Sequence, residues 1–315
     1  MKVCVLAGGV GAARFLAGLV TVTDPASVTA VVNVADDMVL HGLHISPDLD
    51  TVTYTVAGQI NPETGWGLVG ESWTTMGELG RLGGVAWFGL GDKDLATHLY
   101  RTQRLAEGAT LSGVTTELAR SFGLGCRVLP VSDDPVRTRV TLGPAASRGL
   151  AGSEVGFQDW FVGMSHDEPV AALRFEGAEL AAPAPGVVDA ITEADVVVIA
   201  PSNPLVSIEP VLAVPGVRAA VRQRRDHVVA VSPIVGGRAL KGPADRLMAD
   251  LGIEPSVTGV ARLYAPLAAT LVVDSVDAGL ADDVEGAGMR CVVTPTVMSG
   301  RPEAAALARV VIGHD

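Results

Sequence analysis

Four aspartates, Asp36, Asp37, Asp48 and Asp50, lie close together near the start of the chain, and a glycine-rich turn over residues 8–11 precedes them. A glycine turn between a strand and a helix aims backbone N–H groups at one point, which is a common binding site for phosphate. Carboxylates crowded around a phosphate would repel it. A divalent cation removes this conflict, because Mg²⁺ binds carboxylate and phosphate oxygens together. The spacing therefore predicts magnesium-assisted chemistry on a phosphorylated ligand.

A structural interpretation of the same residues stays open. Asp48 or Asp50 could cap a helix, and the acidic pair at 36–37 could form a turn. The turn Gly8-Gly9-Val10-Gly11 could likewise connect a strand to a helix without binding anything. It is not a Walker loop, and Arg14 stands where a dinucleotide site would have its last glycine.

The familiar signatures of covalent catalysis are missing from the sequence. It contains no G-x-S-x-G elbow, no H-E-x-x-H and no C-x-x-C motif. Direct transfer to an acceptor hydroxyl is then the better prediction, because in such reactions the protein mainly positions the reactants and stabilises charge.

The elements that must hold these residues follow a rhythm of strand, polar loop and helix. Strands are expected at 2–7, 28–34, 195–200, 228–231, 271–274 and 290–293. Apolar runs such as Val196–Ile199 are typical of strands buried on both faces. The pattern predicts an α/β fold with a doubly wound, mostly parallel Rossmann-like sheet in three α/β/α layers.

Ligands of such sheets bind beyond the carboxyl ends of the strands. The polar residues that follow successive strands are therefore candidates for binding a nucleotide-like ligand. Besides the glycine turn, they are Asn33, Ser202, Asn203, Ser232, Pro233 and Ile234.

The middle of the chain breaks this rhythm. We predict a nucleotide-binding core from residues 1–60 and 181–315, and an inserted, largely helical cap over residues 61–180. Helices are expected at 72–82, 94–107 and 112–122, and strands at 127–131, 137–142 and 157–162. In the second helix His98 and Arg101 are three residues apart, so they lie on neighbouring positions of one face. An exposed helix of mixed charge is the plainer interpretation of that segment.

The composition excludes several classes of protein. The chain has 315 residues, of which 48% are hydrophobic and 4% aromatic, so it can bury a large aliphatic core. A net charge of −12 argues against a nucleic-acid partner. The three cysteines are widely spaced in apolar runs, which favours free thiols in a reducing compartment. No apolar run is long enough for a membrane span, so we expect a cytoplasmic protein.

These segments, in this order, resemble the 2-phospho-L-lactate transferase family (CofD/FbiA type) of deazaflavin coenzyme F-420 biosynthesis. The resemblance covers nearly the whole chain. The most specific strings are Pro47-Asp48-Leu49-Asp50-Thr51 and Gly91-Asp92-Lys93-Asp94-Leu95-Ala96-Thr97-His98. Further matches are the glycine turn and residues 32–37, 65–67, 129–134, 157–160, 200–204 and 231–234.

The resemblance implies a reaction. The acceptor would be the deazaflavin Fo, whose terminal ribityl hydroxyl attacks a phosphorus of a guanosine diphosphate diester. GMP would leave, and a phospholactyl or phosphoenolpyruvyl group would stay on the deazaflavin. Members of the family use Mg²⁺ and are similar in being cytoplasmic dimers, so a homodimer is expected here.

The resemblance also implies roles for residues. Asp36 and Asp50 would be the catalytic residues and the first metal ligands, with Asp37 and Asp48 as alternate ligands, and one carboxylate would accept the hydroxyl proton. The glycine turn would hold the diphosphate. The acceptor pocket would be formed by Asp37, Trp66, Asp92, His98 and Arg101.

The nature of the transferred group stays open at this stage. The segment His41-Gly42-Leu43 is closer to the actinobacterial branch, which favours enolpyruvyl over lactyl. Two other functions remain as alternatives: a non-catalytic regulator that binds a nucleotide sugar, and an NAD-dependent oxidoreductase in which Asp36 would bind ribose.

Overall fold

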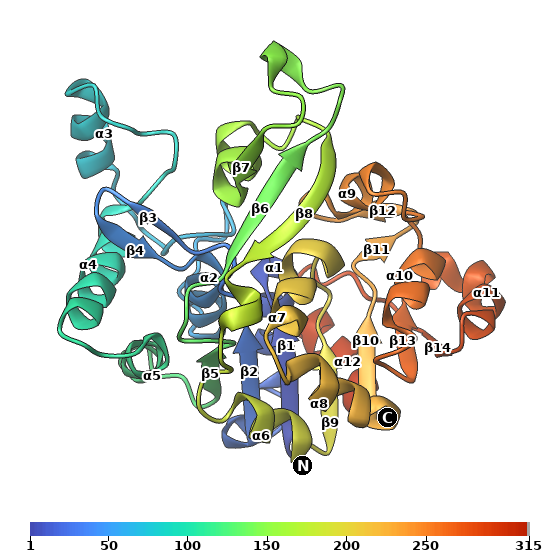
Figure 1. Cartoon of the computed structure of the whole chain (residues 1–315). Coiled ribbons are helices and arrows are strands. Elements are labelled where there is room, and N and C mark those ends of the chain that lie inside the picture. Colours follow the sequence, from blue (N-terminus) through green and yellow to red (C-terminus); the bar gives the residue numbers. More distant parts are fainter. Residues whose placement is uncertain (314–315) are drawn as a thin grey trace.

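The computed structural model describes residues 1–313 and is built on one seven-stranded parallel sheet (Figure 1). Its strand order is β14-β13-β10-β9-β1-β2-β5. The strands are β1 (Val3–Ala7), β2 (Val28–Val32), β5 (Arg127–Pro130), β9 (Val196–Ile199), β10 (Val228–Val231), β13 (Thr270–Val273) and β14 (Arg290–Val293). The expected doubly wound α/β fold is confirmed.

Strand β1 is the centre of the molecule. All five of its residues are buried, and Val5 pairs with Ala30 of β2 on one side and with Val198 of β9 on the other. The chain runs outward from β1 through β2 to β5, and later from β9 through β10 and β13 to β14. The strand order therefore reverses between β1 and β9, and ligands of open α/β sheets bind in the crevice at such a reversal.

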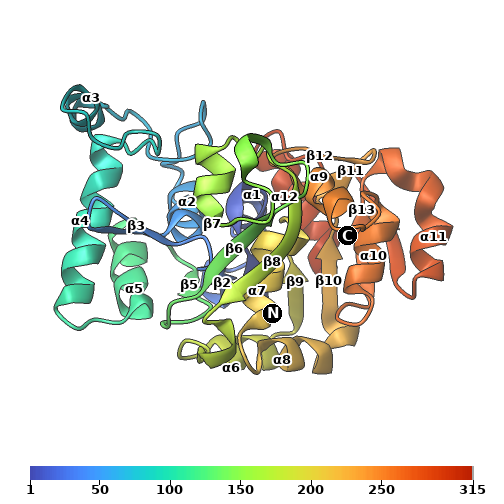
Figure 2. The same ribbon diagram turned by 45° about the horizontal axis from the view of Figure 1, so that its top comes forward.

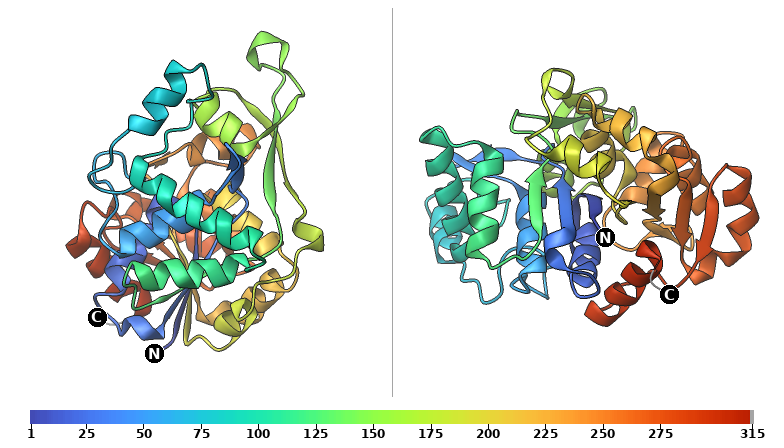
Figure 3. Two further views of the ribbon diagram at one scale, coloured as in Figure 1. Left: turned by 90° about the vertical axis from the view of Figure 1, so that its left-hand side faces the viewer. Right: turned by 90° about the horizontal axis from the view of Figure 1, so that it is seen from below.

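Helices cover both faces of this sheet. One face packs against α1 (Gly9–Leu19), α2 (Pro47–Val56) and α12 (Arg301–Ile312), and the opposite face against α6 (Val187–Thr192), α7 (Glu209–Ala213) and α8 (Val217–Gln223) (Figure 3). Helices α1 and α12 approach closely because residue 18 is glycine: a Cβ there would lie 2.4 Å from the carbonyl carbon of Ala304. The remaining helices of this part are α9 (Ala244–Asp250), α10 (Val257–Tyr264) and α11 (Ala281–Gly286).

The remaining segments lie beside β5 and beyond the carboxyl ends of the central strands (Figure 1 and Figure 2). The helices are α3 (Thr74–Arg81), α4 (Asp92–Ala106) and α5 (Leu111–Ser121). An antiparallel sheet is formed by β7 (Glu154–Gly156), β6 (Arg137–Leu142) and β8 (Val170–Glu176), and small hairpins by β3 (Met38–Leu40) with β4 (Leu43–Ile45) and by β11 (Ile234–Val235) with β12 (Arg238–Ala239).

Two features of the predicted cap differ from the structure. The segment 157–162, predicted as a strand, forms a helical turn over Asp159–Gly163, in which Trp160 is fully buried. Its aromatic residues signalled burial, and burial alone does not distinguish a strand from a helix. In addition, β5 lies within 61–180 but pairs with β2 in the central sheet, so a core strand interrupts that segment.

Two expectations from composition can be compared with the structure. Cys4, Cys126 and Cys291 are free. Within residues 1–313 no single helix is long and apolar enough to cross a membrane. One bent pair, Pro204–Ala213 with Val217–Gln223, reaches the necessary length and apolar composition when its two helices are taken together, but they meet at 98°.

Candidate active site

A cavity of about 790 Å³ opens at the carboxyl ends of the central strands. Its floor consists of the loops that follow β1, β9 and β10, and the start of α2 forms one side. Another part of the cavity wall is formed by aromatic side chains from outside the central sheet. They are Trp66, Phe88, Phe157 and Phe161. The cavity thus lies where the reversal of strand order places a ligand.

The glycine turn forms part of the floor and is fixed by its neighbours. Gly9 has a φ of +71°, and its N–H donates to Asp48 Oδ1 at 2.8 Å. The Ser202 hydroxyl donates to the Gly8 carbonyl at 2.8 Å. A Cβ on residue 11 would lie 2.0 Å from the Pro201 carbonyl oxygen, so only glycine allows this approach of α1 to the loop after β9.

Asn33 lies behind the glycine turn and does not line the cavity. It is fully buried, and its amide donates to Asp48 Oδ2 at 3.0 Å. Its side-chain oxygen accepts the Ala35 N–H at 2.9 Å. Asn33 and Gly9 therefore occupy both oxygens of Asp48, which places the predicted nucleotide ligand Asn33 one layer behind the cavity.

Asp36 and Asp48 form a buried acidic pair on the cavity wall. Burial and then the charge of Asp48 raise the pKa of Asp36 well above its ordinary value, and burial raises the pKa of Asp48 to about 6. Asp36 Oδ1 is buried, and no described residue forms a hydrogen bond with it. An unpartnered carboxylate oxygen next to a second carboxylate is a donor set that suits a hard cation.

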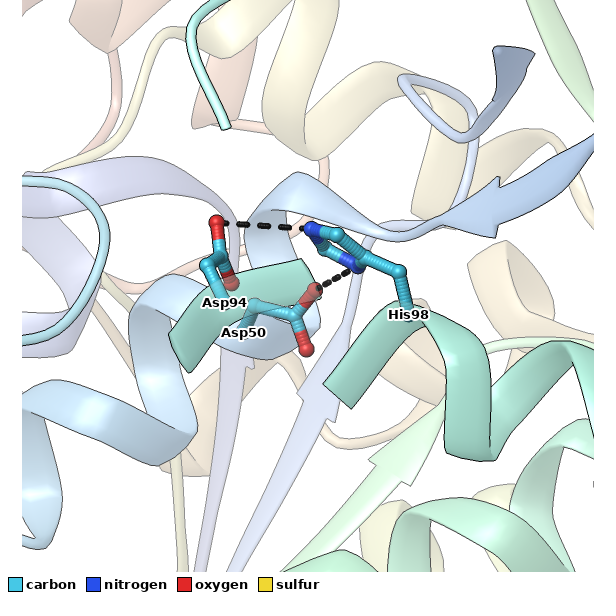
Figure 4. A group of neighbouring side chains, drawn as sticks. All are labelled: Asp50, Asp94 and His98. Carbon is cyan, nitrogen blue, oxygen red and sulfur yellow. Dashed lines mark ion pairs between the residues drawn. The ribbon is translucent and has the colours of Figure 1, made fainter. Parts of the chain in front are cut away.

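A second buried cluster joins α2 to α4 (Figure 4). The ring of His98 lies between two carboxylates, with Nδ1 3.7 Å from Asp50 Oδ2 and Nε2 3.3 Å from Asp94 Oδ2. Ligand atoms of these three side chains all lie within 4.8 Å of one another. This grouping is a second arrangement that could hold a metal ion.

Asp50 is also paired with Arg101. The guanidinium donates to both carboxylate oxygens, with Nη1 3.1 Å from Oδ2 and Nη2 in contact with Oδ1. Both side chains are buried, so this two-point pair fixes the orientation of Asp50. Arg101 itself does not line the cavity and lies behind Asp50, in contrast to its predicted place in the acceptor pocket.

Asp94 was not among the residues singled out as site residues in the sequence. Its carboxylate lines the cavity and accepts the Tyr54 hydroxyl at 2.8 Å. Burial favours its neutral form, but the hydrogen bond and charge of His98 outweigh burial and lower the pKa of Asp94. The sequence does contain a signal for this role of Asp94. It lies four residues before His98, and this spacing puts both side chains on one helix face.

Three other predicted residues lie outside the cavity lining. Asp37 accepts the Ser46 hydroxyl at 2.7 Å, and burial raises its pKa to about 7. Asp92 accepts the backbone N–H groups that begin α3, from Thr74 and Thr75 at 3.1 Å. The Ile234 backbone exchanges hydrogen bonds with the Ser232 hydroxyl, which shapes the turn after β10.

The other predicted site residues do line the cavity. They are Gly8, Gly9, Val10, Gly11, Asp36, Asp48, Asp50, Trp66, His98, Ser202, Asn203, Ser232 and Pro233. The structure thus brings together three strand-end loops, two acidic clusters and an aromatic wall. This combination suits a ligand that carries both phosphate and an aromatic ring.

The sequence matches the family described as 2-phospho-L-lactate transferase CofD over residues 3–289. The chain belongs to the CofD family. Curated relatives include a phosphoenolpyruvate transferase of Streptomyces griseus, 45% identical over 311 residues that cover 98% of this chain and 96% of the relative. Another is the phosphoenolpyruvate transferase of Mycolicibacterium smegmatis, 40% identical over 98% of this chain and 97% of the relative.

The fold of this CofD-family chain is also similar to that of a UPF0052-family protein from Bacillus halodurans. That crystal structure gives a TM-score of 0.61 at 18% identity and covers 99% of this chain and 98% of the other. At this identity the likeness concerns the fold alone.

Membership of the CofD family defines the kind of chemistry. The protein is an enzyme that transfers a phosphate-containing group in coenzyme F-420 biosynthesis. The predicted family resemblance is confirmed. The sequence had left two other functions open, a non-catalytic regulator and an NAD-dependent oxidoreductase. Membership of a transferase family favours neither of them.

Proposed function

We propose that the protein transfers a phosphoenolpyruvyl group from enolpyruvyl-diphosphoguanosine to the ribityl hydroxyl of the deazaflavin Fo. The hydroxyl oxygen forms a bond to the phosphorus that carries the three-carbon group. The bond from that phosphorus to the GMP oxygen breaks, and GMP leaves. The observation that carries this proposal is one cavity with a glycine turn, two acidic clusters and an aromatic wall.

The donor nucleotide is assigned to the strand-end loops. The turn at Gly8–Gly11 lines the cavity at the start of α1, where a helix favours negative charge, and of its N–H groups the one at Gly9 is already bonded to Asp48. Ser202 and Asn203 after β9, and Ser232 and Pro233 after β10, line the adjoining floor. We assign the diphosphate to the glycine turn and the guanosine to the other two loops.

The acceptor is assigned to the aromatic side of the cavity. Phe157 and Phe161 stack with ring centroids 5.3 Å apart and planes inclined by 13°, and both line the cavity. Trp66 and Phe88 contribute further rings from a different segment. A planar tricyclic ring fits such a wall, because aromatic stacking adds to the burial of apolar area.

The acidic clusters provide the acid–base and metal functions. Asp50 is held in place by Arg101 and lies in the cavity wall, which suits it to accept the proton of the attacking hydroxyl. Asp36 with Asp48, and Asp50 with Asp94 and His98, are the residues that would hold Mg²⁺. When bound, the ion would neutralise charge on the diphosphate.

The transferred group is proposed from the relatives. Those described above are phosphoenolpyruvate transferases, which favours enolpyruvyl over lactyl for this chain. A homodimer in the cytoplasm remains our expectation for the assembly and its location.

The test is the mass of the product formed from Fo with each candidate donor. Purified protein is incubated with Fo, Mg²⁺ and either the enolpyruvyl or the lactyl diester of GDP, and the products are separated by mass spectrometry. The proposal predicts the dehydro product and GMP in equal amounts from the enolpyruvyl donor. If only the lactyl donor is used, the transferred group is phospholactyl and not phosphoenolpyruvyl. If neither donor gives a product, the proposed transfer to Fo is refuted.

A further inference from the structure

Two exposed cations line the cavity, and neither has an acidic partner among residues 1–313. Arg14 extends from α1, and Lys241 lies just beyond β12, so two distant parts of the chain supply them. Arg14 donates to the Met298 carbonyl at 3.4 Å and Lys241 to the Thr64 carbonyl at 3.3 Å. Within the part of the chain that the structure describes, neither side chain takes part in an ion pair.

The two cations are also near each other. Burial, followed by the positive charge of Arg14, lowers the pKa of Lys241. Like charges that face one cavity raise its affinity for an anion, because an anion relieves their repulsion. The ammonium group of Lys241 lies against Gly65, which has a φ of +73°: a Cβ there would lie 2.4 Å from Nζ. The backbone of the neighbouring loop thus leaves space for the ammonium group.

The rest of the cavity wall indicates which anion belongs there. Its other ionisable side chains are those of four aspartates and His98, and the ring of His98 lies between two of those carboxylates. A carboxylate on a ligand would be repelled by this acidic side. The diphosphate of the proposed donor already has the glycine turn, so the anion left without a partner is the carboxylate of its three-carbon group.

The location of Arg14 agrees with this choice. It lies three residues after Gly11 and four after Val10, both of which line the cavity, so its side chain leaves α1 on the same helix face. From there a guanidinium reaches beyond the turn toward a group attached to the phosphate, and it binds carboxylates through two parallel hydrogen bonds.

We propose that Arg14 and Lys241 bind the carboxylate of the donor's three-carbon group and so position the reacting phosphorus. This inference rests on the proposed function, because it concerns the donor assigned there. It makes the two cations specificity-determining residues: they distinguish a diester whose second group carries a carboxylate from GDP and from diesters whose second group is uncharged.

The experiment compares two esters of GDP that differ in one charge. Titration calorimetry in Mg²⁺ measures the affinity for the lactyl ester, which carries a carboxylate, and for the ethyl ester, which carries none. The variants are Arg14→Gln and Lys241→Gln, and the matched control is Arg120→Gln on α5, outside the cavity lining. Each cavity variant is expected to bind the lactyl ester at least about tenfold more weakly and the ethyl ester within about twofold of wild type. The control changes neither affinity.

Other outcomes overturn the proposal. If the variants lose affinity equally for both esters, the two cations bind the diphosphate and not the carboxylate. If the affinities for both esters are unchanged, the cations take no part in binding the donor. Product formation by the wild type is measured separately with Fo. If the wild type forms product while the variants bind the lactyl ester normally, this inference fails and the proposed function stands. If the wild type binds neither ester and forms no product, both fail.

Discussion

At the residue scale, the four neighbouring aspartates of the sequence have different surroundings in the structure. Asp48 fixes the glycine turn, and Asp50 is held by Arg101. Asp36 has a buried oxygen to which no residue of the described chain bonds, and Asp37 accepts a hydrogen bond from Ser46 outside the cavity lining. Side chains that look equivalent in the sequence therefore differ in chemistry, because the surrounding groups determine the charge and access of each carboxylate.

Two aspartates at the start of α4 provide a matched pair of variants. Asp94 lines the cavity beside His98, whereas Asp92 points to the start of α3. We expect Asp94→Asn to lower kcat for product formation by at least about a hundredfold, because it removes a charge from the proposed metal and proton-transfer cluster.

Asp92→Asn is the control for that variant. It should keep kcat within a few-fold of wild type and lower the free energy of unfolding only slightly, because it weakens the cap at the start of α3. Thermal unfolding of both variants shows whether each is folded. A similar loss of kcat in both variants would contradict the assignment of the cluster around His98.

Asp37 gives the stability of the protein a specific pH dependence. Burial raises its pKa to about 7 from an ordinary value of 3.8, against the opposing effects of Arg137 and the Ser46 hydroxyl. A carboxyl with a raised pKa stabilises the folded state at low pH, and that contribution is lost as pH rises through about 7. The free energy of unfolding of Asp37→Asn, relative to that of wild type, should therefore increase between pH 4 and pH 8 by at most about 4 kcal/mol.

Urea unfolding at several pH values in EDTA measures this difference. Asp226→Asn is a suitable control, because the Asp226 side chain is 88% exposed and the substitution removes a carboxylate charge at the surface without removing a buried contact. A constant difference for the Asp37 variant over the same range would show that its carboxyl is not held in its neutral form.

At the element scale, the close contact between α1 and the loop after β9 is the feature on which the glycine turn depends. Gly11→Ala would place a Cβ 2.0 Å from the Pro201 carbonyl oxygen, so backbone must move. We expect a loss of about 1–3 kcal/mol in the free energy of unfolding and a weaker affinity for GDP.

Gly77→Ala on α3 is the matched control for that substitution. A Cβ at residue 77 would meet no atom of the described residues within 4 Å, so alanine should stabilise the helix by about 0.5–1 kcal/mol. Chemical denaturation and GDP titration measure both quantities. Wild-type stability and GDP affinity in Gly11→Ala would show that the turn does not require this contact.

The sequence allowed the regular elements to be predicted where local pattern and burial agree. The strand predicted at 195–200 and the helix predicted at 94–107 are examples, because an apolar run or a helical spacing of apolar residues identifies each. The helical turn at Asp159–Gly163 could not be predicted, because its rings pack against residues distant in sequence. The place of Asn33 behind the cavity also depends on tertiary contacts, in this case with Asp48 and Val206.

At the scale of the whole molecule, the cavity wall includes residues from Gly8 to Ser299. A ligand bound there contacts parts of the chain that meet only after folding. It therefore binds the folded state and not the unfolded chain, and it must raise the stability of the whole protein by mass action.

We expect GDP with Mg²⁺ to raise the melting temperature by about 5 °C at a hundred times its dissociation constant, which corresponds to about 2.7 kcal/mol. GDP in EDTA should give a clearly smaller rise if the acidic clusters hold the ion that binds the phosphates. Differential scanning fluorimetry measures both values, with adenosine diphosphate as the control nucleotide. Equal rises in melting temperature with and without Mg²⁺ would show that the nucleotide binds independently of the metal.

The central claim is that the diphosphate binds on the glycine turn while the neighbouring aspartates hold the metal. A crystal structure with GDP and Mg²⁺ tests it most directly. The account predicts phosphate oxygens within hydrogen-bonding distance of the N–H groups at Gly8–Gly11, and an ion bound to a carboxylate of Asp36, Asp48, Asp50 or Asp94. A nucleotide whose phosphates lie away from the turn, with no ion at any of these carboxylates, would contradict it.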